Sequence, residues 1–134
     1  MFSQFSPAAR AVVTLAEQEC RNASHYYLGT EHLLLAMAIA PPPDISARFE
    51  RDGVERWQVK WACRAGMEPA SDHPWEGVIL TPRVRRIFEA ATAAKQNAFV
   101  APIDILEAMI ADGGGVAARV LDSLTTRDRA RTAS

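Results

Sequence analysis

Apolar residues recur along most of the chain at helical spacing, and no stretch shows the alternation expected of a convincing strand. The first helix is predicted to begin at Ser6-Pro7, where the hydroxyl can accept from an unpaired N–H group and the proline loses no hydrogen bond. We expect this helix to end near Asn22. Its buried stripe consists of Ala9, Val12, Val13, Ala16 and Cys20.

Residues 31–40 carry apolar side chains on most sides, so we expect them to form a central, buried helix. Thr30 is the predicted N-cap of this helix, and Glu31 would lie at the positive end of its dipole. Three prolines at 41–43 end the helix, because they supply no helical N–H groups.

Two shorter helices and a linker follow. Asp44 is the predicted cap of a helix that ends at Gly53, a residue suited to the left-handed conformation. The next helix, 54–65, has at helical spacing Trp57, Trp61 and Ala62. Residues 67–78 contain prolines, a glycine and polar residues, a composition that predicts a linker.

The second half begins as the first does. Thr81-Pro82 repeats the cap-and-proline start, and the buried stripe of its helix consists of Val84, Ile87, Phe88 and Ala91. Further helices are predicted over 102–111 and 116–124, with three glycines between them. The polar tail 125–134 is expected to fray.

The two halves read as copies of one helical motif. The matched positions, at offsets of 75 (82 − 7), 72 (106 − 34) and 71 (119 − 48), are Pro7 with Pro82, Leu34 with Leu106, and Arg48 with Arg119. Three blocks in the same order predict an all-α domain of two tandem repeats, of about four and three helices, related by a pseudo-twofold axis. A groove is expected where the first helices of the repeats meet.

These blocks divide a single domain, 1–134, into four parts. They are repeat one at 1–66, the linker at 67–79, repeat two at 80–124 and the polar tail at 125–134. Because packing between the repeats supplies the surface that one repeat alone would seek by dimerising, we expect a monomer.

Composition narrows the class of protein. The 134 residues are 49% hydrophobic and 23% charged, as in globular domains, and the net charge of −1 argues against a nucleic-acid binder. No signal peptide or membrane-spanning run is present, so we expect a cytoplasmic protein that binds no membrane. Cys20 and Cys63 fall within predicted helices and are expected to be reduced thiols.

The sequence resembles a known family over nearly its whole length. Residues 25–35, HYYLGTEHLLL, resemble the H-N-Y-I-G-T-E-H-L-L-L signature of the N-terminal (Clp repeat) domain of ClpA- and ClpC-type unfoldases. Residues 80–83 and 116–121 resemble the F-T-P-R and V-A-A-R-V-L blocks of that family. The resemblance implies a domain that binds peptides, adaptor proteins or tagged substrates of the Clp system.

Three departures from the family pattern limit what this resemblance implies. Repeat two has Ala101-Pro102-Ile103-Asp104 where the family often has G-T-E-H, its preceding loop is shorter, and its final helix is missing or reduced to the tail. No GxxxxGK[ST] phosphate loop is present. If the chain is complete, we expect a stand-alone relative without an ATPase.

The resemblance also implies a site for phosphorylated arginine at Thr30 and Glu31, with Glu31 holding the guanidinium and helix-start N–H groups available to the phosphate. The alternative is that Glu31 only balances the helix dipole. His32, beside the leucine run, is expected to be a core residue. His25, Glu31 and His32 match no metal pattern, and we expect no metal, cofactor or catalytic residue.

The expected groove between the first helices is the main binding candidate. Its predicted residues are Phe2, Arg10, Val13, Thr14 and Glu17 in repeat one, and Leu80, Arg85 and Glu89 in repeat two. The family resemblance implies that such a groove can take up cyclic peptide natural products. The alternative is that Phe2 packs in the core and that the charges form a solvated face. Arg83, Arg85 and Arg86 form a basic cluster, which could meet acidic partners or phosphate or could be a solvated helix face.

Three hypotheses of function follow. The first is a non-catalytic binding module for peptides, adaptors or substrates, which could compete with or regulate a full-length ClpC-type unfoldase. The second is a sequestering protein that binds cyclic-peptide antibiotics aimed at the unfoldase N-domain. The third is an enzyme on this scaffold, which clustered acids and bases in a deep pocket would favour.

Overall fold

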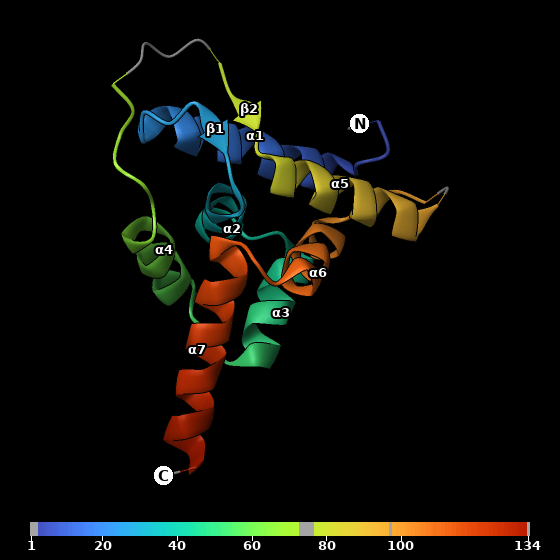
Figure 1. The fold of residues 1–134 in the computed structure, drawn as a ribbon. Helices are drawn as coiled ribbons and strands as arrows, with labels where there is room; N and C mark the ends of the chain where they lie inside the picture. The colour runs from blue at the N-terminus through green and yellow to red at the C-terminus, as the bar shows by residue number, and fades with distance from the viewer. Residues whose placement is uncertain (1–2, 73–76, 97, 134) are drawn as a thin grey trace.

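The computed structural model describes residues 3–72, 77–96 and 98–133, with side chains as far as Thr125. Its elements are α1 Pro7–Asn22, β1 Tyr27–Leu28, α2 Thr30–Ile39, α3 Pro43–Asp52, α4 Arg56–Ala65, β2 Ile79–Leu80, α5 Pro82–Lys95, α6 Pro102–Asp112 and α7 Val116–Ala133 (Figure 1). The predicted all-α class is confirmed. No helix in the part of the chain described here is long and apolar enough to cross a membrane.

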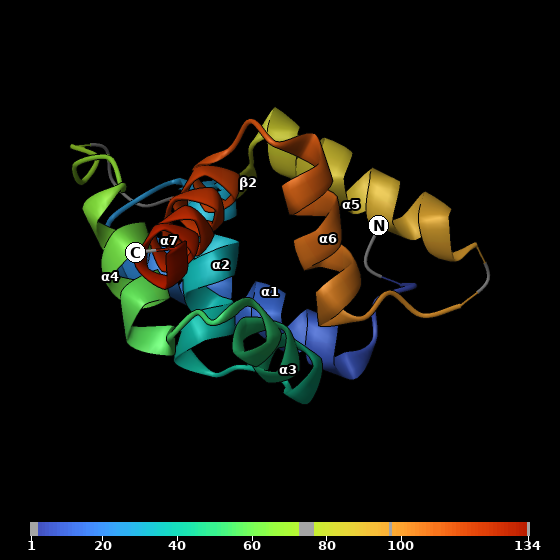
Figure 2. The same ribbon diagram turned by 90° about the horizontal axis from the view of Figure 1, so that it is seen from below.

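Helix α2 lies at the centre of the molecule, as predicted, and every residue from Thr30 to Ala38 is buried. Helices α1 and α5, with the two short strands, lie on one side of it, and α3, α4 and α7 lie on the other (Figures 1 and 2). One continuous core joins the two repeats, and Phe5 packs edge-to-face on Phe88 with 5.2 Å between ring centroids. Cys20 and Cys63 are free, buried thiols in this core.

The backbone reproduces the sequence repeat as a twofold arrangement. β1 pairs in parallel with β2, with Leu28 opposite Leu80, and an isolated bridge joins Phe5 to Val100. Adding 75 to Phe5 gives Leu80, and adding 72 to Leu28 gives Val100, so the two pairings are equivalent. The segment before the first helix of each repeat therefore pairs with the segment before the second helix of the other.

These strands correct the expectation of no strand. They are two residues long and join parts of the chain that lie 52 positions apart (79 − 27), so neither leaves a periodic signal in the sequence. β2 also includes Ile79, the last residue of the predicted linker.

Two predicted caps are confirmed, and they are equivalent by the repeat offset. The Ser6 hydroxyl accepts from the N–H of Ala9 at 3.1 Å, and the Thr81 hydroxyl accepts from the N–H of Val84 at 3.1 Å. Both helices then continue with proline in their first turn. Local sequence therefore defines the start of both outer helices.

Two other predicted caps were wrong. The N-cap of α2 is Gly29 rather than Thr30, and the N-cap of α3 is Pro42 rather than Asp44. Thr30 and Asp44 lie inside their helices, and both side chains accept hydrogen bonds from the other repeat. The Thr30 hydroxyl accepts from the N–H of Ala117 at 3.2 Å, and the Asp44 carboxylate accepts from that of Ile103 at 3.0 Å.

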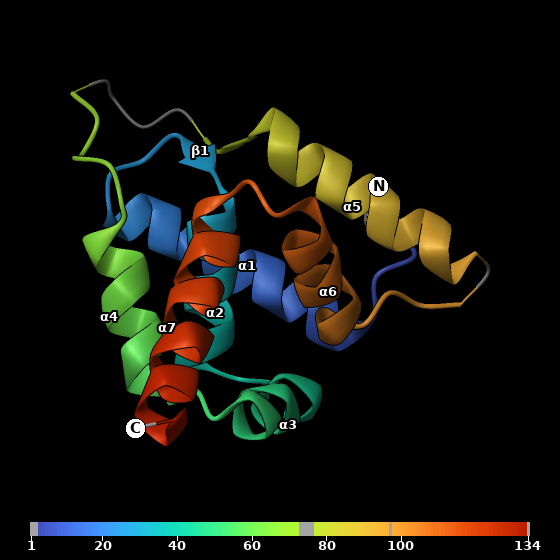
Figure 3. The same cartoon turned by 60° about the horizontal axis from the view of Figure 1, so that its bottom comes forward.

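Helix α7 was predicted to end near Leu124, but it continues to Ala133. Its sequence has neither glycine nor proline after Val116, so nothing in the polar tail stops the helical backbone. Figure 3 shows α7 as a long helix with α4 on one side and α6 and α3 on the other.

Candidate functional site

The start of α2 is held by two buried histidines. His32 is fully buried, and its Nδ1 accepts from the N–H of Gly29 at 3.0 Å. Its Nε2 must then carry the proton, which it donates to Nδ1 of His25 at 2.8 Å; Nε2 of His25 in turn donates to the carbonyl of Glu68 at 2.8 Å. His32 is thus a core residue, as predicted, and its neutral form is built into the fold.

Glu31 is buried beside this chain, with 6% of its surface exposed. Burial raises the pKa of its carboxyl, while the N–H of Glu31 itself and the charge of Arg119 lower it. Its Oε1 lies 3.8 Å from Nδ1 of His32. That contact is no ion pair, because burial lowers the pKa of His32 to about 4 and its Nδ1 already accepts a hydrogen bond.

A cleft of about 430 Å³ opens at the start of α2, bordered by the start of α5 and the loop between α6 and α7. We call it the Glu31 cleft. It is lined by Tyr27, Gly29, Thr30, Glu31, Thr81, Pro82, Arg83, Arg86, Gly114, Gly115, Val116 and Arg119. Both residues of the predicted phosphoarginine site, Thr30 and Glu31, therefore line one cleft.

Three arginines, Arg83, Arg86 and Arg119, line this cleft together with the carboxylate of Glu31. Arg83 donates to the carboxylate of Asp112, and this hydrogen bond lowers the pKa of Asp112. Within the described part of the chain, neither Arg86 nor Arg119 forms an ion pair. The cleft can therefore offer two cations to an anion and one carboxylate to a cation.

The equivalent place in repeat two is closed. Counting 72 residues from Gly29 to His32 gives Ala101 to Asp104, and Asp104 accepts from the N–H of Ala101 at 2.8 Å, as His32 does from Gly29. Where Glu31 would stand is Ile103, whose N–H is already bonded to Asp44. The position equivalent to Asp44 in repeat two (44 + 71) is Gly115, which has no side chain to fill the Glu31 cleft.

The predicted groove between the first helices is only partly assembled. Thr14 and Glu17 of α1 line a hollow of about 260 Å³ together with Gln18, Arg21 and Val78. Val13 is 6% exposed and belongs to the core, so it supports this surface from beneath rather than lining it.

The remaining predicted groove residues lie on the same side but outside that hollow. Arg10 is exposed and donates to the carbonyl of Ser3 at 3.3 Å. Arg85 and Glu89 are exposed on α5, and Leu80 is half-buried in β2. Phe2 lies outside the described residues.

Arg119 lies in the V-A-A-R-V-L block but was not predicted to be a site residue. The loop between α6 and α7 carries this arginine across to the start of α2, a long-range contact without a local signal. Arg83 and Arg86 were recognised only as part of a basic cluster. In the structure these two line the Glu31 cleft, whereas Arg85 does not.

Several chaperone proteins are similar to this chain in sequence. No family model matches the chain. Chaperone protein ClpB of Oceanobacillus iheyensis is 27% identical over 127 residues, and chloroplastic ClpC1 of Oryza sativa subsp. japonica is 30% identical over 128 residues. Each alignment covers 92% of this chain but only 16% and 14%, respectively, of the relative.

Solved structures of similar fold are N-domains. The N-domain of ClpV from Vibrio cholerae gives a TM-score of 0.74 at 16% identity, covering 84% of this chain and 69% of that one. A complex of the ClpV N-domain with a VipB peptide gives a TM-score of 0.69 at 17% identity, covering 82% and 69%. The N-terminal domain of ClpD from Arabidopsis thaliana gives 0.68 at 21% identity, covering 98% and 99%.

The signature at the start of α2, the twofold pairing of the two repeats and these relatives agree with one another. The chain is a Clp N-terminal (Clp repeat) domain.

Proposed function

We propose that this domain is a non-catalytic binding module for peptides, adaptor proteins or tagged substrates of the Clp system, and that the Glu31 cleft is its site for phosphorylated arginine. The observation that carries the proposal is one buried carboxylate in the same cleft as Arg86 and Arg119. A phosphorylated arginine presents a guanidinium and a phosphate close together, so it needs a carboxylate and cations within reach of one side chain. The ClpV N-domain complex with a VipB peptide supports peptide binding by this fold.

The geometry favours one such site rather than two. In repeat two, Ile103 offers no carboxylate, Pro102 lacks an N–H group, and the Asp44 carboxylate already occupies the helix start. A second anion there would meet a negative charge where the Glu31 cleft has only Gly115.

Calorimetry with a phosphoarginine peptide tests this proposal. We expect one site per chain, and we expect Glu31→Gln to weaken binding at least tenfold, because a charge-assisted hydrogen bond contributes about 1.5–3 kcal/mol. Glu50→Gln, on the exposed surface of α3, is the matched control and should bind as the parent does. The same peptide without its phosphate should bind far more weakly.

Two equivalent sites would contradict the proposal, as would binding that survives Glu31→Gln. Circular dichroism of the variant guards against misreading a folding defect. The substitution keeps the shape of the side chain, and burial already raises the pKa of Glu31, so we expect the fold to tolerate the neutral amide.

The alternative function is sequestration of a cyclic peptide antibiotic on the surface between α1 and α5. The hollow lined by Thr14, Glu17 and Val78 favours it, since it lies beside the predicted groove residues. A cyclic hydrophobic peptide should lose affinity with Phe2→Ala and not with Glu31→Gln, whereas a phosphoarginine peptide should show the reverse. Testing both variants against both ligands separates the two functions.

For the first of these functions we also propose a regulatory setting. The domain would act in the cytoplasm by competing for ligands of a full-length ClpC-type unfoldase. Adding it to an unfoldase assay should slow degradation of a phosphoarginine-tagged substrate, and Glu31→Gln should remove that inhibition.

A further inference from the structure

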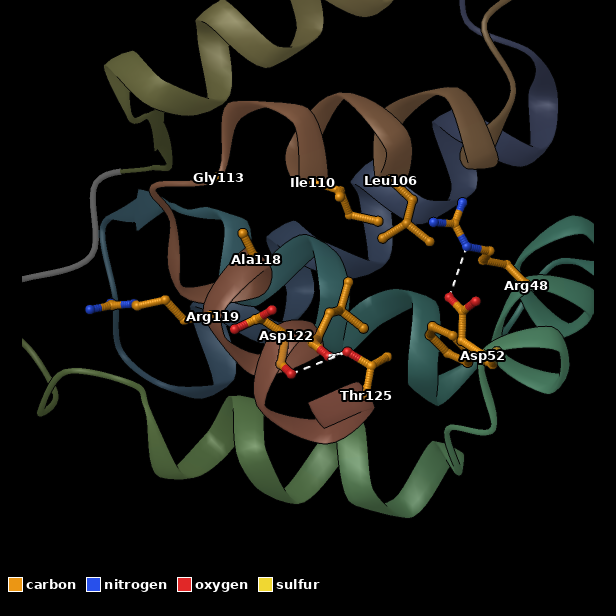
Figure 4. A pocket seen from close by; sticks show the side chains of 11 residues that line it. Arg48, Asp52, Leu106, Ile110, Gly113, Ala118, Arg119, Asp122 and Thr125 are labelled. Carbon is orange, nitrogen blue, oxygen red and sulfur yellow. Dashed lines mark hydrogen bonds and ion pairs between the residues drawn. The ribbon is translucent and has the colours of Figure 1, made fainter. Parts of the chain in front are cut away.

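A second groove lies on the opposite side of the molecule from α1 and α5, between α3, α6 and α7 (Figure 4). It encloses about 430 Å³. The side chains of Leu106 and Ile110 point from α6 into it, Arg48 and Asp52 border it on α3, and Asp122 borders it on α7 (Figure 4).

The internal repeat shows what belongs in such a groove. In repeat one, α4 packs against α2 and against α7 of repeat two. The twofold relation converts α2 into α6 and α7 into α3. The equivalent of α4 would therefore lie against α6 and α3, in this groove, yet no helix of the described chain occupies that place.

One pair of equivalent residues differs in exposure because α4 covers only one of them. Ala38 near the end of α2 is fully buried, and Arg56 of α4 bonds to its carbonyl. Its counterpart in α6 is Ile110 (38 + 72), a larger apolar residue that is 38% exposed. Repeat two thus leaves open to solvent an apolar position that repeat one covers with a helix.

Helix α4 also gives the chemistry of the occupant. It buries Val59 and Cys63, which are four residues apart. Its first residue, Arg56, donates to the carbonyls of Ala38 and Ile39, at 3.0 Å each. A cation in that position matches the negative end of a helix dipole.

The same cation would find equivalent acceptors in the open groove. The carbonyls equivalent to those of Ala38 and Ile39 are those of Ile110 and Ala111, at the end of α6. Asp52 is paired with Arg48 at 2.8 Å, so its charge is balanced, whereas Asp122 adds negative charge at the rim. Arg119 also lines the groove, but its guanidinium points away from it (Figure 4). The acceptors left for a cation are therefore Asp122 and the carbonyls at the end of α6.

We propose that this groove binds, in trans, an amphipathic helix of a partner protein. That helix would carry small apolar residues four positions apart and an arginine or lysine in its first turn, and it would lie in repeat two where α4 lies in repeat one. This is recognition of an amphipathic helix by a groove that has both apolar and charged residues in its lining. Arg119 lines both this groove and the Glu31 cleft, but Ile110 lines only the groove and Glu31 only the cleft, and helix binding here does not depend on the function proposed above.

The probe is a synthetic peptide with the sequence of residues 54–66, which includes α4, labelled with a fluorophore and kept reduced. Lysines replace Trp57 and Trp61 in the peptide, because these side chains are 67% and 69% exposed on α4 and are not needed for its buried face. We expect saturable one-to-one binding by fluorescence anisotropy. The same peptide with Val59→Asp should lose binding at least tenfold, and with Arg56→Glu about fivefold or more.

On the protein, Ile110→Glu should weaken binding of this peptide at least tenfold. Ile79→Glu is the matched control, since Ile79 is 63% exposed and lies outside the groove, and it should change the affinity by less than twofold. Glu31→Gln should likewise leave this affinity unchanged, which keeps the test independent of the phosphoarginine site.

Backbone amide shifts provide a readout that does not require a variant. We expect the peptide to shift the amides of Arg48, Ile110 and Ala118. Absence of saturable binding, or binding that is indifferent to Ile110→Glu, would overturn the proposal. Shifts centred on α2 and α4 would also overturn it, because they would mean that the peptide displaces the protein's own α4.

Discussion

At the scale of single residues, Gly29 and Glu31 form a matched pair. A Cβ on Gly29 would overlap the carboxylate of Glu31, which folds back over the start of α2. The equivalents in repeat two are Ala101 and Ile103, where no carboxylate folds back and a Cβ is present. The glycine therefore provides space for the buried acid rather than an unusual backbone angle.

His32 makes stability depend on pH. Burial lowers its pKa to about 4, against about 6.5 in an unfolded chain, so the unfolded state binds more protons between these values. The stabilisation is fully present above pH 6.5 and is lost as pH falls towards 4. We expect the free energy of unfolding, measured with urea, to drop by about 3 kcal/mol between pH 7 and pH 4 from this group.

The control for this prediction is His32→Asn, whose side chain can still accept from the N–H of Gly29. Glu31 titrates in the opposite sense, because its pKa is raised, and its contribution remains in both proteins. Comparing the two therefore isolates the histidine. An equally steep loss of stability on acidification in His32→Asn would show that other groups cause it.

At the scale of elements, the repeats support each other through their helix starts. Asp44 in the first turn of α3 accepts from Ile103 in the first turn of α6, and Thr30 in the first turn of α2 accepts from Ala117 in the first turn of α7. These bonds satisfy N–H groups that a helix cannot pair internally. Each repeat thus caps a helix of the other.

Removing the Asp44 cap tests this arrangement. We expect Asp44→Ala to lower the free energy of unfolding by about 1 kcal/mol, and Asp44→Asn, which keeps an acceptor, to lower it by less. Urea denaturation of both variants measures the difference, and Asp72→Ala, at an exposed position outside the helices, is the control. Equal effects of the alanine and asparagine variants would argue against a capping role.

Features that depend on neighbouring residues could be predicted from the sequence. Features that depend on contacts between residues far apart in the chain could not. Ser6 and Thr81 cap the helices they precede, so their helices were placed correctly. Thr30 and Asp44 look like caps, but their acceptors serve the other repeat. The family motif identified Glu31, whereas Arg119 joins the same cleft only because α7 packs against the start of α2.

At the scale of the whole molecule, the two repeats share the arrangement of their backbones but differ in the residues and helices that occupy equivalent places. The Glu31 cleft is open in repeat one, and its counterpart is closed by Asp44. The groove for a fourth helix is filled by α4 in repeat one and open in repeat two. The Glu31 cleft and the open groove adjoin each other, since Arg119 lines both.

This architecture also bears on association. A single repeat would expose its apolar face, but here one core joins both repeats within the chain, so the interface that a dimer would supply already exists. The large apolar side chains that remain exposed belong to several elements, with Trp57 and Trp61 on α4, Ile110 on α6 and Ile79 on β2. Groups of one or two apolar side chains are smaller than a stable interface requires.

We therefore expect light scattering to give the mass of one chain at every concentration in the micromolar range. Ile110→Glu should leave that mass unchanged, because no second copy fills the groove in dilute solution. A dimer mass that does not vary with concentration would contradict this expectation. If Ile110→Glu then restored the monomer, a second copy of the chain would be the occupant of the groove between α3, α6 and α7, in place of a helix from another protein.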